Sequence, residues 1–365
     1  MASSLRCGSC VLVAAVTAMT AACLADDKPG ASGATRDDVA RPTPSGVRFA
    51  IAQPRVHTYS IVARDKATGQ LGVAVQSHWF SVGPIVPWAE AGVGAVATQS
   101  LVDPAYGPLG LELMRRGKTA ADALRGLLAS DEGREFRQVA MIDAAGRVAT
   151  HTGGKCIAEA GHVAHEDAQF SVQANLMEKD TVWPAMAQAY RDAEGDLAER
   201  LIAALEAAER EGGDIRGRQS AALLIVKGEA TGKPWADRLF DLRIEDHPTP
   251  VQELKRLVNL QRAYHHMNAG DAAIEKKDFE TANREYAAAE RYAPDIVEIP
   301  FWHAVTLTSG GQLDQALPIF KSVFTRERRW VEVVPRLVPP GLLPDDPETI
   351  ARIQAQAPNR TKGVP

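Results

Sequence analysis

The chain lacks three features that would place it in a familiar class. It has four cysteines in 365 residues, and only Cys156 lies beyond residue 23, so an intramolecular disulfide framework in the folded part is excluded. Basic residues are not in excess, because 41 Lys and Arg face 46 Asp and Glu, and this balance gives no reason to expect a nucleic-acid partner. The apolar run Val11–Ala22 is too short to span a bilayer as a stable anchor.

The N-terminus instead predicts export. Arg6 precedes the apolar run, and small residues follow it, as in a signal peptide covering residues 1–25. The sequence Thr-Ala-Ala before Cys23 resembles the lipobox of bacterial lipoproteins, although the aliphatic residue usual three places before the cysteine is here Thr20. Lipidation of Cys23 and ordinary cleavage both stay open, so we expect a periplasmic protein or a membrane-anchored lipoprotein of a bacterium. Residues 26–53 are rich in Pro, Gly, Ser and Asp and predict a flexible linker.

Residues 58–103 contain the clearest strand pattern of the chain. Thr58–Ala63 and Leu71–Ser77 are β-branched, apolar runs, and the polar segment between them carries a glycine, which predicts a hairpin. A third run, Val93–Thr98, predicts another strand. These strands end in polar groups, which on a rigid sheet either build an active site or are ordinary strand ends.

The remainder of residues 54–246 predicts an α+β domain. Amphipathic helices are expected after Asp103, over 120–128, from about 181, and over about 195–211. Further strands are expected over 138–142, 147–152, 170–174, 219–226 and 238–244. Strand runs that alternate with helix pairs fit layered antiparallel sheets.

Several motifs together resemble a bacterial and archaeal family, domain of unknown function 1028. They read TYSIVARDKATGQLGVAVQSHWFSVG, PWAEAGVGAVATQS, DPAYGPLGLELM, HTGGKC, AGH, FSVQANLM and TVWPAMAQAY, in family order from Thr58 to about Leu242. The resemblance implies the four-layer αββα sandwich of the N-terminal-nucleophile (Ntn) hydrolases. It fixes no substrate.

An Ntn hydrolase uses the first residue of its mature chain as nucleophile and the free α-amine of that residue as base, since an amine with a pKa of about 8 lies beside the hydroxyl that it must deprotonate. The corresponding residue here is Thr58, which needs a cut after His57. Self-cleavage by the Thr58 hydroxyl is one route. The alternative is that Thr58 is an ordinary strand threonine in an uncut chain.

Other polar residues of these motifs are candidates for the same site. We expect Thr58, Gln99, Asp103, His151 and Asn175 to form the catalytic group, and Ser77, His78, His162 and Gln173 to contact substrate. Gln173 and Asn175 could donate to an oxyanion. The spacing of the histidines and Cys156 fits no known metal-ligand pattern, so no metal and no cofactor are expected.

The C-terminal third predicts helices. After a Pro-rich boundary at His247–Pro250, a helix is expected from Val251 to about Met267. Large and small apolar residues then recur 34 residues apart, the tetratricopeptide period: Phe279, Ala282, Tyr286 and Ala289 match Leu313, Ala316, Phe320 and Val323. Residues 247–338 therefore predict helical repeats that either dock a protein partner, a second copy of the chain included, or simply extend the fold. Residues 339–365 predict a poorly ordered Pro-rich tail.

The leading interpretation is an exported hydrolase of an amide bond in a small molecule or a cell-wall peptide. The alternative is a non-catalytic envelope protein that binds a ligand with the same fold and holds a partner with the repeats. A third possibility is an assembly factor in which only the helical part matters.

Overall fold

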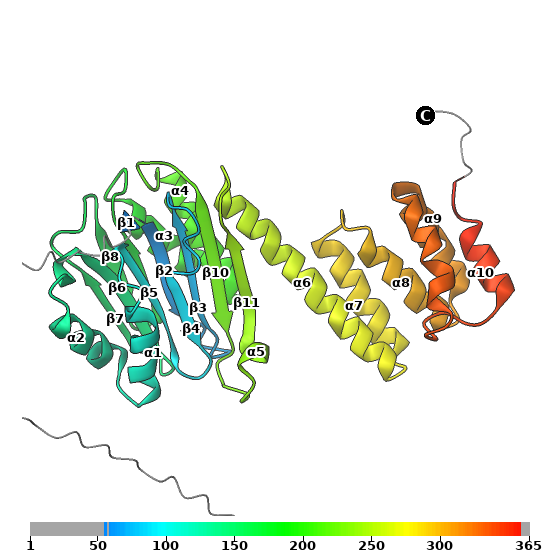
Figure 1. The fold of residues 1–365 in the computed structure, drawn as a ribbon, viewed down its shortest axis with the longest axis horizontal. Coiled ribbons are helices and arrows are strands. Elements are labelled where there is room, and N and C mark those ends of the chain that lie inside the picture. Colours follow the sequence, from blue (N-terminus) through cyan, green and yellow to red (C-terminus); the bar gives the residue numbers. More distant parts are fainter. Residues whose placement is uncertain (1–54, 57, 359–365) are drawn as a thin grey trace, which may run out of the picture. The chain divides into compact units, whose positions relative to one another are not determined.

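The computed structural model describes residues 55–56 and 58–358 of the chain (Figure 1). The expected signal peptide (residues 1–25), Cys23, the expected linker (residues 26–53) and His57 lie outside the described residues. Within the described ranges, no helix has both the length and the apolar character needed to cross a membrane.

The strands form two antiparallel sheets, so the α+β class expected from the sequence is confirmed. The first sheet has the order β1-β5-β6-β7, with β4 also paired to β5. Its strands are β1 (Arg55–Val56), β4 (Pro87–Glu90), β5 (Gly94–Leu101), β6 (Arg137–Asp143) and β7 (Val148–Thr152). The second sheet has the order β11-β10-β3-β2-β9-β8. Its strands are β2 (Thr58–Arg64), β3 (Leu71–Ser77), β8 (Gly161–His165), β9 (Phe170–Ala174), β10 (Ser220–Val226) and β11 (Arg238–Ile244).

The hairpin predicted between the first two long strands is present and sets the register of the site. Asp65 Oδ1 accepts hydrogen bonds from the backbone N–H groups of Ala67 and Thr68, and Gly69 takes a φ of 73° that a β-branched residue would resist. This turn places Thr58 directly opposite Ser77.

Helices lie against both sheets. α1 (Tyr106–Arg115) and α2 (Ala120–Ser130) pack on the first sheet, and α3 (Val182–Asp192) and α4 (Leu197–Arg210) pack on the second. Side chains alternate along each strand, so one face of each sheet meets its helices and the other meets the opposite sheet. Val62 and Val73 of the second sheet and Ala97 and Ala140 of the first belong to one buried cluster between the sheets.

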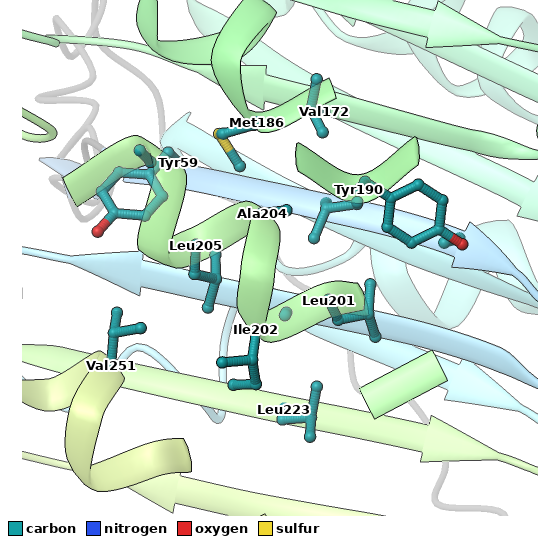
Figure 2. Close-up of a cluster of buried hydrophobic side chains, with 14 of the residues drawn as sticks. Tyr59, Val172, Met186, Tyr190, Leu201, Ile202, Ala204, Leu205, Leu223 and Val251 are labelled. Carbon is teal, nitrogen blue, oxygen red and sulfur yellow. The ribbon is translucent and has the colours of Figure 1, made fainter. Parts of the chain in front are cut away.

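α4 shows how the outer core forms from the sequence. Asp196 caps the helix by accepting from the Glu199 N–H at 3.0 Å, and Leu201 and Leu205 lie one turn apart on the face toward the sheet. Figure 2 shows these leucines with Tyr59 and Leu223 in one cluster. Burying one such leucine contributes about 2 kcal/mol.

Three strands were not predicted from the sequence: β4, β8 and the two-residue strand β1. β4 begins at Pro87, and β8 is an edge strand whose residues alternate between partly buried and exposed, so neither shows a continuous apolar run. Edge and irregular strands carry the weakest sequence signal because only one of their sides is fully packed.

The C-terminal part is helical. Its helices are α6 (Pro250–Glu275), α7 (Phe279–Tyr292), α8 (Glu298–Ser309), α9 (Leu313–Arg326) and α10 (Pro347–Gln354), with the 3₁₀ helices η2 (Arg328–Glu332) and η3 (Val334–Leu337). Two short helices lie within the two-sheet domain instead: η1 (Arg134–Phe136) before β6 and α5 (Pro234–Asp237) between β10 and β11. α6 begins with Val251 and Leu254 in the cluster of the second sheet, and its later residues Ala263 and Met267 pack with Tyr286 of α7.

α6 is longer than the expected helix that ends near Met267. It continues through Gly270, where an added Cβ would lie 2.8 Å from the Tyr286 ring, so the glycine serves close packing rather than termination. The expected poorly ordered tail is also wrong up to residue 358, because α10 lies there and its Ile353 is fully buried. Residues 359–365 lie outside the described part.

The 34-residue period is visible in the helices themselves. α7 begins and ends 34 residues before α9, and α6 ends 34 residues before α8. The turns correspond as well: Lys277 and Gly311 both have positive φ, 60° and 78°. Two helix pairs therefore repeat with this period, whereas their assignment as tetratricopeptide repeats stays a prediction.

Candidate functional site

Thr58 is the first residue of β2 and is fully buried. Its hydroxyl donates to Ser77 Oγ at 3.0 Å. Its carbonyl oxygen accepts from the Asn175 backbone N–H and from Gln99 Nε2, each at 3.1 Å, and from Asn175 Nδ2 at 3.4 Å. Thr58 is therefore fixed through both its side chain and its carbonyl by residues of three other elements.

Gln138 is the centre of the surrounding network. Its Oε1 accepts from Gln99 Nε2 at 2.7 Å and from Asn175 Nδ2 at 2.9 Å. Its Nε2 lies 2.9 Å from both the Ala174 carbonyl oxygen and Thr152 Oγ1. This one side chain joins both sheets and orients the two amides that hold the Thr58 carbonyl.

A second branch of the network runs through Ser60, two residues after Thr58 on the same face of β2. Ser60 Oγ donates to Gln99 Oε1 at 2.6 Å and accepts from Gln173 Nε2 at 2.6 Å. Gln173 Oε1 in turn accepts from Ser171 Oγ at 3.0 Å, and Ser171 Oγ lies 2.7 Å from Thr150 Oγ1. Near Thr58, buried amides and hydroxyls joined in this way take the place of the apolar contacts that Val62, Val73, Ala97 and Ala140 make elsewhere between the sheets.

The network is costly to break because its polar groups are sealed from water. Gln99, Gln138, Gln173 and Asn175 all have no exposed surface. Each buried donor that loses its acceptor costs about 1–3 kcal/mol. Such a fully bonded group holds its members in fixed orientations, which a catalytic or ligand-binding site requires.

His162 connects this network to the surface. Its Nδ1 lies 2.9 Å from Thr152 Oγ1, and Thr152 Oγ1 already accepts from Gln138 Nε2. The Thr152 hydroxyl can accept a second hydrogen bond or donate its own proton, so the direction of the bond to His162 depends on the tautomer of the imidazole. Burial, and secondarily the nearby His151, lower the pKa of His162 and so favour its neutral ring.

His151 and Asp103 are held by other contacts. His151 pairs with Val139, on the face of the first sheet opposite to Gln138 and Thr152, and its Nε2 lies 2.8 Å from the Arg134 carbonyl oxygen. Asp103 Oδ1 accepts from the Ala105 N–H at 3.0 Å in the turn before α1. The hydrogen bonds that the structure gives these two side chains thus do not lead to Thr58.

His78 lies at the same strand end as Ser77. Its backbone N–H donates to Asp214 Oδ2 at 3.2 Å, and Asp214 forms an ion pair with Arg216 at 2.6 Å. Among the described residues, neither His78 Nδ1 nor the amide of the adjacent buried Gln76 has a hydrogen-bond partner. Buried polar atoms of His78 and Gln76 that could bond to a ligand therefore lie near the Thr58–Ser77 pair.

The backbone is strained around this end of the sandwich. Ser100 and Leu176 have φ values of 74° and 57°, in the left-handed region that non-glycine residues seldom adopt. Ser100 pairs with Val56 of β1, and Leu176 follows Asn175. Strain of this kind costs about 1–3 kcal/mol per residue and concentrates at functional sites.

The chain passes from one sheet to the other at the candidate cut. Val56 is paired with the first sheet through β1, and Thr58 begins β2 of the second sheet. β4 covers β5 only from Gly94 to Ala97, so at Ser100 and Leu101 the pairing on this side comes from β1. A strand that ends two residues before the candidate nucleophile thus covers an edge of β5.

Cys156 does not have the properties of a nucleophile. Burial raises the pKa of its thiol, and its Sγ donates to the Arg137 carbonyl oxygen at 3.4 Å. No group of three or more His, Cys, Asp or Glu side chains within the described ranges could hold a metal ion.

The structure thus brings five of the predicted residues together and adds others. Thr58, Gln99, Asn175, Ser77 and Gln173 belong to the network directly, and His162 joins it through Thr152. Sequence reasoning missed the residues Ser60, Gln138, Thr150, Thr152 and Ser171. A usable signal exists, since Ser60, Gln99, Gln138 and Gln173 are uncharged polar residues that share their strands with apolar residues.

Comparison with known proteins locates the same segment. The model of a family of unknown function, DUF1028, matches residues 58–254, more than half of the chain, and its match begins at Thr58. The crystal structure of protein SPO2555 from Silicibacter pomeroyi, described as DUF1028, is similar with 30% sequence identity and a TM-score of 0.50. The similarity covers 55% of this chain and 88% of that one. No curated protein matches the chain.

Proposed function

The chain belongs to DUF1028, a family of unknown function, and from this membership and the site geometry we propose that it is an Ntn-type amide hydrolase with Thr58 as nucleophile. The proposal requires that the bond between His57 and Thr58 be cut. The observation that carries it is the position of Thr58: first residue of β2 and of the family match, with its hydroxyl and carbonyl both held by the buried network.

The arrangement of elements supports the fold part of this proposal. One helix pair packs on each sheet, and a buried cluster lies between the sheets. We assign this arrangement to the four-layer αββα class of the Ntn hydrolases. In that class the nucleophile begins a central strand, as Thr58 begins β2 between β3 and β9.

The chemistry follows from a free Thr58 α-amine. The amine takes the proton of the Thr58 hydroxyl as Oγ1 attacks the substrate amide carbon. The resulting ammonium returns that proton to the leaving nitrogen, so the C–N bond breaks and an ester forms on Oγ1. Water, deprotonated by the same amine, then attacks the ester and releases the carboxylic acid and the free hydroxyl.

The surrounding residues position the nucleophile. Ser77 Oγ orients the Thr58 hydroxyl, while Gln99 and Asn175 hold the Thr58 carbonyl. Gln138 fixes both of those amides. Since the amide of Asn175 is already bound to Gln138 and to Thr58 itself, its role in this proposal is positioning rather than oxyanion stabilisation.

Cleavage would also open access to the site. In the continuous chain Thr58 is fully buried, and β1 covers β5 at Ser100 and Leu101. Release of the segment before Thr58 would leave that edge able to pair with an extended peptide. We therefore favour a small amide or a cell-wall peptide as substrate, met by an exported protein.

Covalent trapping tests the proposal. A β-lactone probe, which acylates an N-terminal threonine, should label the processed protein at Thr58, and Thr58→Ala should abolish the label. Thr68→Ala, in the exposed β2–β3 turn, is the matched control and should label normally. Label at another residue, or equal label in Thr58→Ala, would rule out Thr58 as nucleophile.

A second candidate function is ligand binding without catalysis. The specific observation in its favour is that the continuous chain seals Thr58 completely and satisfies its carbonyl with three donors. An uncut native protein that never reacts with the β-lactone would favour this function.

A further inference from the structure

A cavity lies in the helical part, far along the chain from Thr58. Its volume is about 630 Å³, and α6, α7, α8 and the segment at Gly341 and Leu342 line it. Volumes of this size accommodate small molecules or a few peptide residues. Ser309 Oγ donates to the Leu342 carbonyl oxygen at 2.7 Å and so ties the segment to α8.

The cavity wall combines aromatic rings with two carboxylates and one lysine, Lys277. Glu298 accepts from the Tyr264 hydroxyl and from Trp302 Nε1, each at 3.2 Å. Asp271 accepts from the Tyr286 hydroxyl. Each carboxylate is thereby oriented by aromatic side chains that line the same cavity.

Neither charge is neutralised by an ion pair. Within the described part of the chain, Asp271 and Glu298 form no salt bridge with Lys, Arg or His, whereas the nearby Glu285 and Glu290 pair with His266 and His303. A carboxylate oxygen can accept two hydrogen bonds, so Glu298 keeps acceptor capacity beyond its two aromatic donors.

The wall also holds a nearly buried hydroxyl. Thr306 is 1% exposed and lines the cavity. Its side chain interacts with the hydroxyl of Tyr286, which itself donates to Asp271. A hydroxyl that donates one hydrogen bond can still accept another, so Thr306 offers an acceptor to a polar group in the cavity.

We propose that this cavity binds an organic cation, a guanidinium or ammonium group on an apolar stem, such as the side chain of a basic peptide. Asp271 and Glu298 supply the negative charge, the rings of Tyr264, Tyr286 and Trp302 supply faces for the cation and its stem, and Thr306 accepts a further hydrogen bond. The binding site is independent of Thr58 chemistry.

Isothermal titration with matched probes tests the proposal on the full chain. An acetylated Ala-Arg-Ala amide should bind, and the same tripeptide with citrulline, a neutral isostere of arginine, should bind at least about tenfold more weakly, equivalent to about 1.4 kcal/mol. Agmatine, which carries the guanidinium without a peptide, distinguishes a small-molecule amine from a peptide as the source of the cation. Higher salt should weaken binding because the attraction is electrostatic.

Variants locate the contact. Glu298→Gln and Asp271→Asn should each weaken binding of the arginine peptide several-fold, and Thr306→Val, which keeps the side-chain shape, should weaken it without unfolding the helical part. Glu280→Gln, on the exposed surface of α7 outside the cavity, should leave binding unchanged. Equal affinity for arginine and citrulline peptides, or no binding of arginine peptide and agmatine at millimolar concentration, would overturn the proposal.

Discussion

The stability of the buried network gives a prediction that the structure quantifies. Gln138→Leu keeps the approximate volume of the side chain but removes its five hydrogen bonds, at distances of 2.7–3.2 Å. Gln99 Nε2 keeps the Thr58 and Gln173 carbonyl oxygens as acceptors, but Asn175 Nδ2 loses one of its two acceptors and the Ala174 carbonyl oxygen loses a donor, in a site without water access. At about 1–3 kcal/mol for each buried group that loses its partner, we expect the free energy of unfolding of the sandwich to fall by about 2–4 kcal/mol.

The assay is urea denaturation followed by circular dichroism, with the midpoint compared at constant slope. Gln188→Leu is the control, because Gln188 is exposed on α3 and its side chain, within the described ranges, bonds to Asp192 and Arg191 one turn further along the same helix. It should change the free energy of unfolding by less than about 0.5 kcal/mol. A loss below 1 kcal/mol for Gln138→Leu would refute the described network.

Three further predictions concern other parts of the chain. Lys277→Gly should stabilise the helical part by about 0.5–1 kcal/mol, because Lys277 has a φ of 60° where glycine avoids the left-handed penalty, and the midpoint of thermal unfolding should rise. Gly72→Ala should destabilise the sandwich by about 1–3 kcal/mol, since its Cβ would lie 2.8 Å from Leu201 Cδ1; an unchanged urea midpoint would contradict this. Asp131→Asn should cost about 3 kcal/mol at pH 7 and less at pH 3. Burial raises the pKa of Asp131, but hydrogen bonds, chiefly from Arg137, outweigh burial and lower the pKa. The stabilisation by the Asp131–Arg137 pair is therefore fully present above the unfolded pKa of about 4, and it is lost as the pH falls through the folded pKa. A cost that does not change between these pH values would contradict that account.

Much of the sandwich could be predicted from local sequence. The β2–β3 hairpin and the turn with Gly146 follow from β-branched runs broken by residues suited to positive φ. β8 could not be predicted in the same way, because its register on β9 is set by contacts that the sequence does not show locally. The length of α6 depends on the fit of Gly270 against Tyr286, which is likewise a tertiary contact.

The site was only partly predictable for a similar reason. Thr58 and Gln99 stand out because each lies near the end of a predicted strand. The role of Gln138 could not be predicted, because it depends on the two sheets facing each other, which places Gln138 between Gln99 and Asn175. His151 has the residue type expected of a catalytic base, yet the alternation of β7 turns it to the other face from Thr152. Counting that alternation through each strand would have separated the two.

The most direct test of the account is the N-terminal sequence and intact mass of the protein recovered from its native host. The account predicts a chain that begins Thr58-Tyr59-Ser60. A native, functional protein that still contains the His57–Thr58 bond would contradict the Ntn mechanism and leave ligand binding as the function of this fold.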